Sequence, residues 1–354
     1  MLVYLLNFIS IPVYSLLFKN KKRMIIFVVS IQLFLLLALR ADTLGADLGN
    51  YRLYYEHYRT MSFWDILKGF RPIGGSAHDY GLESGYVFLN WIIGKIGFDF
   101  NAYLIVYAAL IIPSVALFID RYCEDVGLGL ATFVSLGGFM SMFSTLRQSL
   151  ALAIFLFALP YLVNRKFWRF VLIVIAAGLF HQSFFIALLL YPFSIFKANR
   201  TLYTSVIFIS VALIFFIPPI YNNVLFPILL KLGRYYYISD FAWNNLFVLL
   251  LGIAILVMLF FKQHTKYDNA MLCGYVMTIP LQSIAFYVPV FSRLSGSVFI
   301  NFLCPVIPGL VNSFKTQSQR FQAKTVAYTV LLAFYVYTLI IEDFVVPYVP
   351  FWAA

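Results

Sequence analysis

The chain alternates long apolar runs with short polar breaks, and within each run the apolar residues are continuous. About 20 apolar residues cross the hydrocarbon core of a bilayer as a helix. Strands of a transmembrane barrel would instead alternate apolar and polar positions. The pattern therefore predicts an all-α polytopic membrane protein, a single transmembrane domain over residues 1–354 with about 10–13 transmembrane helices. The predicted spans cover about residues 1–18, 24–40, 101–119, 126–143, 146–163, 168–181, 183–196, 201–218, 244–261, 269–289, 294–312 and 325–341.

Two apolar segments need a different interpretation. Residues 85–97 would form a helix of only about 20 Å, so we expect a re-entrant or interfacial helix there. Residues 170–196 could form one long span, but we expect two short helices that meet near His181. This arrangement keeps the basic breaks that follow on one side of the membrane. The polar turn at His181 would then lie below the membrane surface, where it must line a cavity inside the protein.

The composition narrows the class of protein. Hydrophobic residues make up 63% of the chain, charged residues only 11%, and the mean hydropathy is +0.90. These values exclude a water-soluble globular enzyme, a disordered chain and a nucleic-acid-binding domain, so we expect no nucleic acid partner. The three cysteines and four histidines have neither paired nor metal-ligand spacing. The sequence therefore predicts no disulfide framework, no metal site and no cofactor.

The distribution of charge predicts the topology. The net charge is +11, and basic residues gather in several breaks between spans. When successive spans are placed in alternating directions, all of the excess charge falls on one face and the other face is neutral. Because basic residues mark cytoplasmic loops, that face is predicted to be cytoplasmic and residues 41–84 to form an extracytoplasmic loop. The basic breaks are residues 19–23, 164–169, 197–200, 262–266 and 315–324.

The outer loop combines carboxylates with tyrosines at helical spacing. Tyr51, Tyr54, Tyr55 and Tyr58 recur on one face of a helix. One interpretation is an interfacial amphipathic helix with an aromatic belt. The other is a sugar-binding surface, where sugar rings stack on the aromatic side chains and carboxylates accept hydrogen bonds from hydroxyl groups. The two interpretations are compatible.

Isolated ionisable residues stand at the outer ends of later spans: Arg147, His181, Lys231, Arg234 and Arg293. Such groups are costly near a bilayer and usually face a cavity or a partner. The alternatives are arginines that snorkel to the interface, a histidine that packs between helices, and a solvated loop for Lys231 and Arg234. Arg147 and Arg293, however, lie on the side where positive charge is disfavoured. Guanidinium groups that converge in an outward cavity can grip phosphate oxygens, so the pattern favours a pyrophosphate site.

Five short motifs follow one another along the chain. They are Gly45-x-Asp47 with Tyr51 and Tyr54, Glu83-x-Gly85-Tyr86 with Asn90, Leu146-Arg147-Gln148-x-Leu150-Ala151, Phe180-His181-x-Ser183, and Ser292-Arg293. This order resembles the EpsG family, which is allied to the Wzy-type O-antigen and exopolysaccharide polymerases of bacteria. The resemblance spans about residues 40–300. Many Wzy proteins carry their large outer loop late in the chain, whereas here it is early, which fits the EpsG-like branch better.

The resemblance implies a metal-independent membrane glycosyltransferase of the GT-C type. It would lie in the bacterial cytoplasmic (inner) membrane with its active site facing outward. There it would join oligosaccharide repeat units carried on undecaprenyl pyrophosphate, to make O-antigen, capsule or exopolysaccharide. The implied partners are the lipid-linked donor and acceptor and membrane lipid, with a chain-length regulator as a further candidate.

Residues of the motifs suit the steps of that reaction. The attacking hydroxyl needs a base, for which Glu83 is the first candidate, Asp47 the second and His181 the third. His181 could instead donate a hydrogen bond to a phosphate. The candidates for pyrophosphate binding are Arg147, Arg293 and Arg234. The candidates for sugar binding are Tyr51, Tyr54, Tyr86 and Asn90.

Three other functions remain open from the sequence. A lipid-linked oligosaccharide flippase or another transporter would place charges in mid-membrane and often show inverted repeats, neither of which is evident. An O-antigen ligase or a single-sugar transferase is not separated from a polymerase by the resemblance. A membrane O-acyltransferase would use His181 as its base, but acyl-CoA would need a cytoplasmic route to that residue, against the charge pattern.

Overall fold

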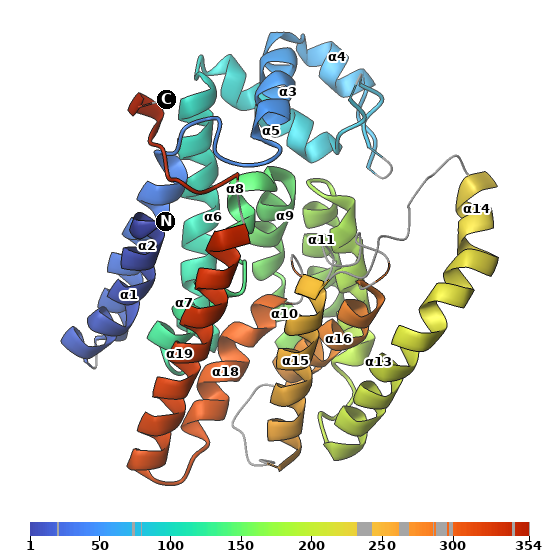
Figure 1. The fold of residues 1–354 in the computed structure, drawn as a ribbon. Helices are drawn as coiled ribbons and strands as arrows, with labels where there is room; N and C mark the ends of the chain where they lie inside the picture. Colours follow the sequence, from blue (N-terminus) through green and yellow to red (C-terminus); the bar gives the residue numbers. More distant parts are fainter. Residues whose placement is uncertain are drawn as a thin grey trace.

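The protein is a bundle of helices with a smaller group of helices covering one end (Figure 1). The computed structural model describes residues 1–19, 21–72, 75–78, 80–231, 243–261, 269–285, 287, 296, 300–341 and 344–353. The first half contains α1 (Leu2–Leu17), α2 (Lys22–Ala38), α3 (Leu48–Thr60), α4 (Phe63–Lys68), α5 (Ser84–Lys95), α6 (Phe100–Tyr122), α7 (Val126–Ser135), α8 (Ser141–Ser144), α9 (Leu146–Leu156), α10 (Leu159–Val163) and α11 (Phe167–Gly178). The second half contains the 3₁₀ helix η1 (Gln182–Leu189), α12 (Leu190–Phe193), α13 (Arg200–Ile220), the π-helix η2 (Tyr221–Leu225), α14 (Phe226–Lys231), α15 (Trp243–Phe261), α16 (Asn269–Ala285), η4 (Ile300–Phe302), α18 (Leu303–Asn312), α19 (Gln317–Ile341) and η5 (Phe351–Ala353).

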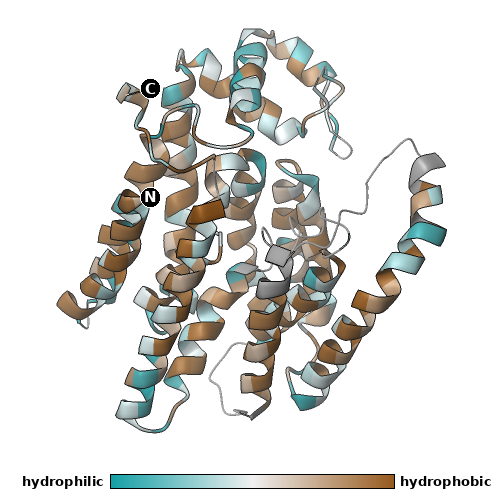
Figure 2. Cartoon of the chain, viewed as in Figure 1, coloured by the Kyte–Doolittle hydropathy of each residue, from teal (hydrophilic) through white to brown (hydrophobic). Residues whose placement is uncertain are grey.

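The predicted class, an all-α polytopic membrane protein, is confirmed. Within the described residues, three helices are long and apolar enough to cross a membrane: Phe100–Tyr122, Arg200–Ile228 and Gln317–Ile341. Several shorter apolar helices pack between and beside them. Figure 2 shows apolar residues along the bundle and hydrophilic residues over α3 and at the far end of α19. This distribution is what a bilayer around the bundle requires.

Side-chain caps fix where the central helices begin. Asp99 accepts a hydrogen bond from the Ala102 amide at 2.8 Å and starts α6, which packs against α2 and α9. Asp125 caps α7 in the same way. Each cap satisfies an amide that has no partner within its helix and contributes about 1 kcal/mol. These caps fix the starts of α6 and of α7, the helix that follows it (Figure 1).

The predicted extracytoplasmic loop 41–84 is folded into two helices, α3 and α4. Together with α5 they cover one end of the bundle, and we call α3–α5 the cap (Figure 1). The tyrosine spacing correctly predicted a helix, because Tyr51, Tyr55 and Tyr58 are the buried face of α3. Tyr55 lies 4.9 Å from the ring of Tyr103 on α6 and joins the cap to the bundle. The short apolar segment 85–97 is α5, which packs on α3 within the cap.

The opposite end of the bundle carries basic breaks that the structure describes, among them residues 21–23 and 315–324, whereas the break at 262–266 lies outside the described residues (Figure 1). Lys22 pairs with Asp120 at 3.2 Å, and Lys324 pairs with Asp125. Both chain termini lie instead toward the cap, where the Tyr4 hydroxyl donates to the Val345 carbonyl at 2.9 Å. The structure therefore separates a basic end from a cap end, as the charge pattern predicted, while the assignment of these ends to the two sides of a membrane stays a prediction.

Several predicted spans are broken or displaced. The segment 126–143 is interrupted after α7, where Gly137 has a φ of 87° and turns the chain. The segment 183–196 is mostly the 3₁₀ helix η1. Helix α19 begins at Gln317 and not near residue 325, because Thr316 and Gln319 form a capping box: the Gln319 amide donates to the Thr316 hydroxyl at 3.2 Å, and the Thr316 amide to the Gln319 side chain at 3.4 Å.

Candidate active site

An ion pair joins the cap to the bundle. The Arg147 Nη1 donates to Glu83 Oε2 at 2.6 Å. Glu83 is the residue before α5, and Arg147 is in the first turn of α9, so the two elements are fixed to each other at this point. The Glu83 side chain is only 8% exposed and that of Arg147 26%, so the pair is sheltered while the Arg147 side chain is still partly open to solvent.

The second Glu83 oxygen is also engaged. Oε1 accepts a hydrogen bond from the Gln182 amide at 3.3 Å. Next to it, the Gly85 amide donates to the Leu179 carbonyl at 2.9 Å. A side chain at position 85 would place its Cβ 2.8 Å from that carbonyl oxygen, so only glycine lets the two backbone segments come this close. The predicted polar turn near His181 is therefore covered by the start of α5, which satisfies its backbone groups.

His181 shapes this turn. Its Nδ1 accepts from the Ser183 amide at 3.3 Å and lies 2.7 Å from the Ser183 hydroxyl, so the ring caps η1. It is the backbone amide of Gln182, the residue after His181, that contacts Glu83. The two short helices predicted on either side of His181 are α11 and η1.

Tyr51 completes the surroundings of the ion pair. Its hydroxyl faces the Arg147 guanidinium, and its side chain is 5% exposed. Burial raises the pKa of the Tyr51 phenol, and the positive charge of Arg147 acts in the opposite direction. Because the phenol stays neutral, it can donate a hydrogen bond to an anion held by Arg147.

The other predicted sugar-binding residues surround Tyr51 at different depths. Tyr86 is fully buried behind it, with the ring centroids 5.8 Å apart, and Asn90 donates to the Tyr86 carbonyl at 2.9 Å. Tyr54 is half-buried and lies 4.7 Å from the ring of Tyr80. Of the four candidates, Tyr54 offers the accessible ring, while Tyr86 packs behind Tyr51 and Asn90 is hydrogen-bonded to the backbone of Tyr86.

Asp47 stands beside this group on the segment that enters α3. Gly45 has a φ of 136° and lies against the Phe143 carbonyl, and the Ala46 amide donates to the Ser144 hydroxyl at 3.0 Å. These contacts hold residues 45–46 against α8 and place the exposed Asp47 one turn before Tyr51. Within the described part of the chain, the Asp47 carboxylate has no hydrogen bond or ion pair, so it is open to a substrate.

Two predicted phosphate ligands cannot be placed. Arg234 and Arg293 lie outside the described residues. A third arginine was not singled out from the sequence: Arg40, which follows α2, is fully buried with its guanidinium 5.1 Å from the Phe143 ring and 5.6 Å from the Tyr107 ring. Its position at the end of an apolar run, on the side where basic residues are scarce, was the signal in the sequence.

The fold and this site define a class: a polytopic all-α membrane protein with a sheltered arginine–glutamate pair where a cap meets the bundle. Comparison with known families gives the particular one. The chain belongs to the EpsG family, whose sequence profile matches residues 23–349, nearly its whole length. Members of this family are Wzy-type polymerases, so the chain is a multi-pass membrane protein of a polysaccharide-polymerase type. No curated protein and no solved structure gives a significant match to the chain.

Proposed function

We propose that the protein joins oligosaccharide repeat units carried on undecaprenyl pyrophosphate, at the outer face of the bacterial cytoplasmic membrane. The observation that carries the proposal is Arg147, a guanidinium held by Glu83 at 2.6 Å, faced by Tyr51 and still partly open to solvent at the cap end. A polyprenyl pyrophosphate sugar matches this place in three parts: its tail lies along the apolar bundle, its pyrophosphate meets Arg147, and its glycan meets the cap.

Arg147 binds the phosphate oxygens of the donor. A guanidinium stays charged and presents its N–H groups in a planar fork that suits two oxygens at once. The first turn of α9 adds the positive end of its dipole. As the bond between the anomeric carbon and the pyrophosphate oxygen breaks, negative charge grows on that oxygen, and Arg147 stabilises it.

The contacts suggest a division of work between the two carboxylates. Both oxygens of Glu83 are engaged, one by Arg147 and one by the Gln182 amide, so Glu83 orients the guanidinium. Asp47 is exposed and unengaged within the described residues, so it is the better base. In the proposed reaction, the acceptor hydroxyl gives its proton to Asp47, its oxygen bonds to the anomeric carbon, and undecaprenyl pyrophosphate leaves with the electron pair of the broken bond.

The variant Asp47→Asn is expected to lower the rate of chain extension by about 10²- to 10⁴-fold, the usual contribution of a positioned base. The amide keeps the size of the side chain, so the melting temperature should not change. Extension of a synthetic lipid-pyrophosphate repeat unit by the purified full chain is the measurement. Asp42→Asn is the control, because Asp42 is a carboxylate of the same segment that pairs with Arg52. Equal rates for Asp47→Asn and wild type would remove Asp47 as the base.

The function itself is tested by the glycan profile of cells that lack the gene. We expect single repeat units on the lipid carrier and no long chains, with long chains restored by the wild-type gene. Repeat units that accumulate at the cytoplasmic face would identify a flippase. Carrier-linked polymer that is complete but never transferred onward would identify a ligase.

A further inference from the structure

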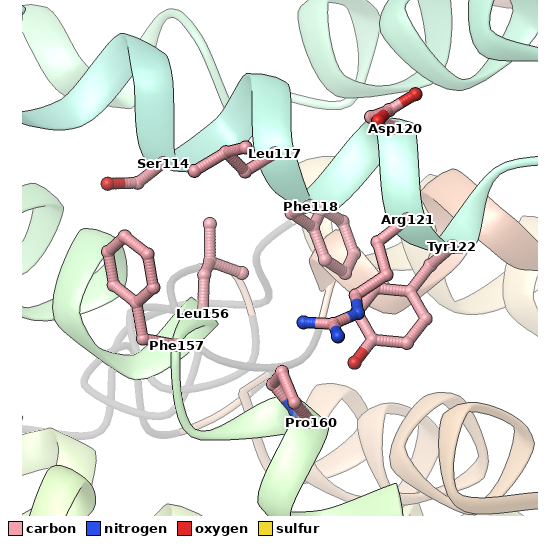
Figure 3. A pocket seen from close by; sticks show the side chains of 9 residues that line it. All are labelled: Ser114, Leu117, Phe118, Asp120, Arg121, Tyr122, Leu156, Phe157 and Pro160. Atoms are coloured by element: carbon pink, nitrogen blue, oxygen red, sulfur yellow. The ribbon is translucent and has the colours of Figure 1, made fainter.

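Three hollows meet at the basic end of the bundle, far from the candidate active site. A cavity of about 290 Å³ lies between α6 and the pair α9–α10 (Figure 3). A groove of about 570 Å³ lies between α2 and α6, and a third hollow of about 530 Å³ lies at the start of α2. All three are lined by Asp120, so they adjoin one another around the last turns of α6.

The cavity between α6 and α9–α10 and the groove between α2 and α6 have mostly apolar walls. Leu117 projects between the clefts and lines both. Leu117 is exposed, at 56%, and so are Phe27 on α2, at 61%, and Phe157 after α9, at 50%. The groove between α2 and α6 is further lined by Ile26, Ile31, Phe34 and Ala116. Two apolar channels that flank one ridge have the form that two hydrocarbon chains require.

The mouth of these clefts carries unneutralised positive charge. Lys22 is paired with Asp120 at 3.2 Å, so the charges of these two side chains neutralise each other. Lys21, Arg23 and Arg121 are exposed and make no ion pair with any residue in the described ranges. Figure 3 shows the Arg121 guanidinium pointing across the cavity toward Pro160, and Arg23 lines both the groove and the hollow at its mouth.

We propose that this site binds a two-chain anionic phospholipid of the leaflet at the basic end. One acyl chain lies in the groove between α2 and α6, the other in the cleft between α6 and α9–α10, and Leu117 separates them. The phosphate lies at the shared mouth, between Arg23 and Arg121. Basic pockets between transmembrane helices are where anionic headgroups bind, and the positive-inside pattern makes this leaflet the cytoplasmic one. The site is distinct from the candidate active site and does not depend on the proposed reaction.

The test measures retained lipid on the full chain by native mass spectrometry, after release from nanodiscs of phosphatidylcholine and phosphatidylglycerol. We expect preferential retention of phosphatidylglycerol, and a loss of that preference of roughly thirtyfold in the double variant Arg23→Gln/Arg121→Gln, from two lost cationic contacts. Ala116→Phe fills the groove without changing the charge and should also reduce retention. Melting temperatures of all variants verify folding.

The matched control is Lys166→Gln/Lys197→Gln, which removes two exposed basic residues from the same end of the bundle, away from the clefts. It should retain phosphatidylglycerol as the wild type does. An equal loss in the control and the arginine variant would show only a general surface attraction. Equal retention of the two phospholipids by the wild type would overturn the proposal, as would preferential retention of undecaprenyl phosphate from nanodiscs that also contain it.

Discussion

Lysine in place of Arg147 is expected to reduce polymer synthesis by about 10²- to 10³-fold, the loss usually seen when one charge-stabilising donor is removed from an active site. The substitution keeps the positive charge beside Glu83, so the ion pair across the cap and the bundle can still form. What it removes is the planar fork, because an ammonium group cannot present two parallel N–H groups to a phosphate. The loss should therefore appear in kcat and not in protein stability.

The measurement is extension of a synthetic undecaprenyl-pyrophosphate repeat unit, with the melting temperature recorded in parallel. Arg52→Lys is the matched control, because Arg52 is an exposed arginine of the same cap that pairs with Asp42. It should be active. An Arg147→Lys variant that makes chains of normal length at a normal rate would place the pyrophosphate elsewhere, whereas an unstable variant would mean that Arg147 acts only through packing.

The long apolar elements were predictable because a single physical requirement, the burial of backbone groups in hydrocarbon, dominates them. Helices α1, α2, α6, α13 and α15 therefore fall within a few residues of their predicted spans. Where a local signal was present but overlooked, the prediction was displaced, as at the capping box Thr316-x-x-Gln319 that starts α19. Breaks such as Gly137 depend on how neighbouring helices pack, and no short-range pattern distinguishes them from tolerated glycines.

The candidate site was predictable in its members but not in their contacts. The scarcity of charge at the outer ends of the spans singled out Arg147 and His181, and the motif around Gly85 with the need for a base singled out Glu83. The structure brings Glu83 to Arg147 and to the residue after His181. The sequence could not show that a backbone amide engages the second oxygen of Glu83. Such a contact joins residues 99 positions apart in the chain, and no sequence pattern reports it. Because it leaves Glu83 fully engaged, the preferred base changes from Glu83 to Asp47.

The cap must be seated on the bundle for these groups to work together, and Gly45 is where this can be tested. We expect Gly45→Ala to lower activity by about 10²-fold, since a displacement of roughly 1 Å at a reacting group is enough for such a loss. An added Cβ would meet the Phe143 carbonyl, a backbone atom that cannot rotate away, and alanine is strained at a φ of 136°. The strain alone costs about 1–3 kcal/mol of stability.

The chain offers a matched control for this change in Gly49, four residues further on. Nothing lies within 4 Å of a Cβ built there, and Gly49 is inside α3, where alanine is favoured by about 1 kcal/mol. Gly49→Ala should therefore be fully active and slightly more stable, while Gly45→Ala loses activity and melts earlier. If both variants behave alike, the segment that carries Asp47 is not seated on Phe143 and Ser144. Asp47 then has no fixed place beside Arg147, and the base must be sought among the remaining ionisable groups of the cap.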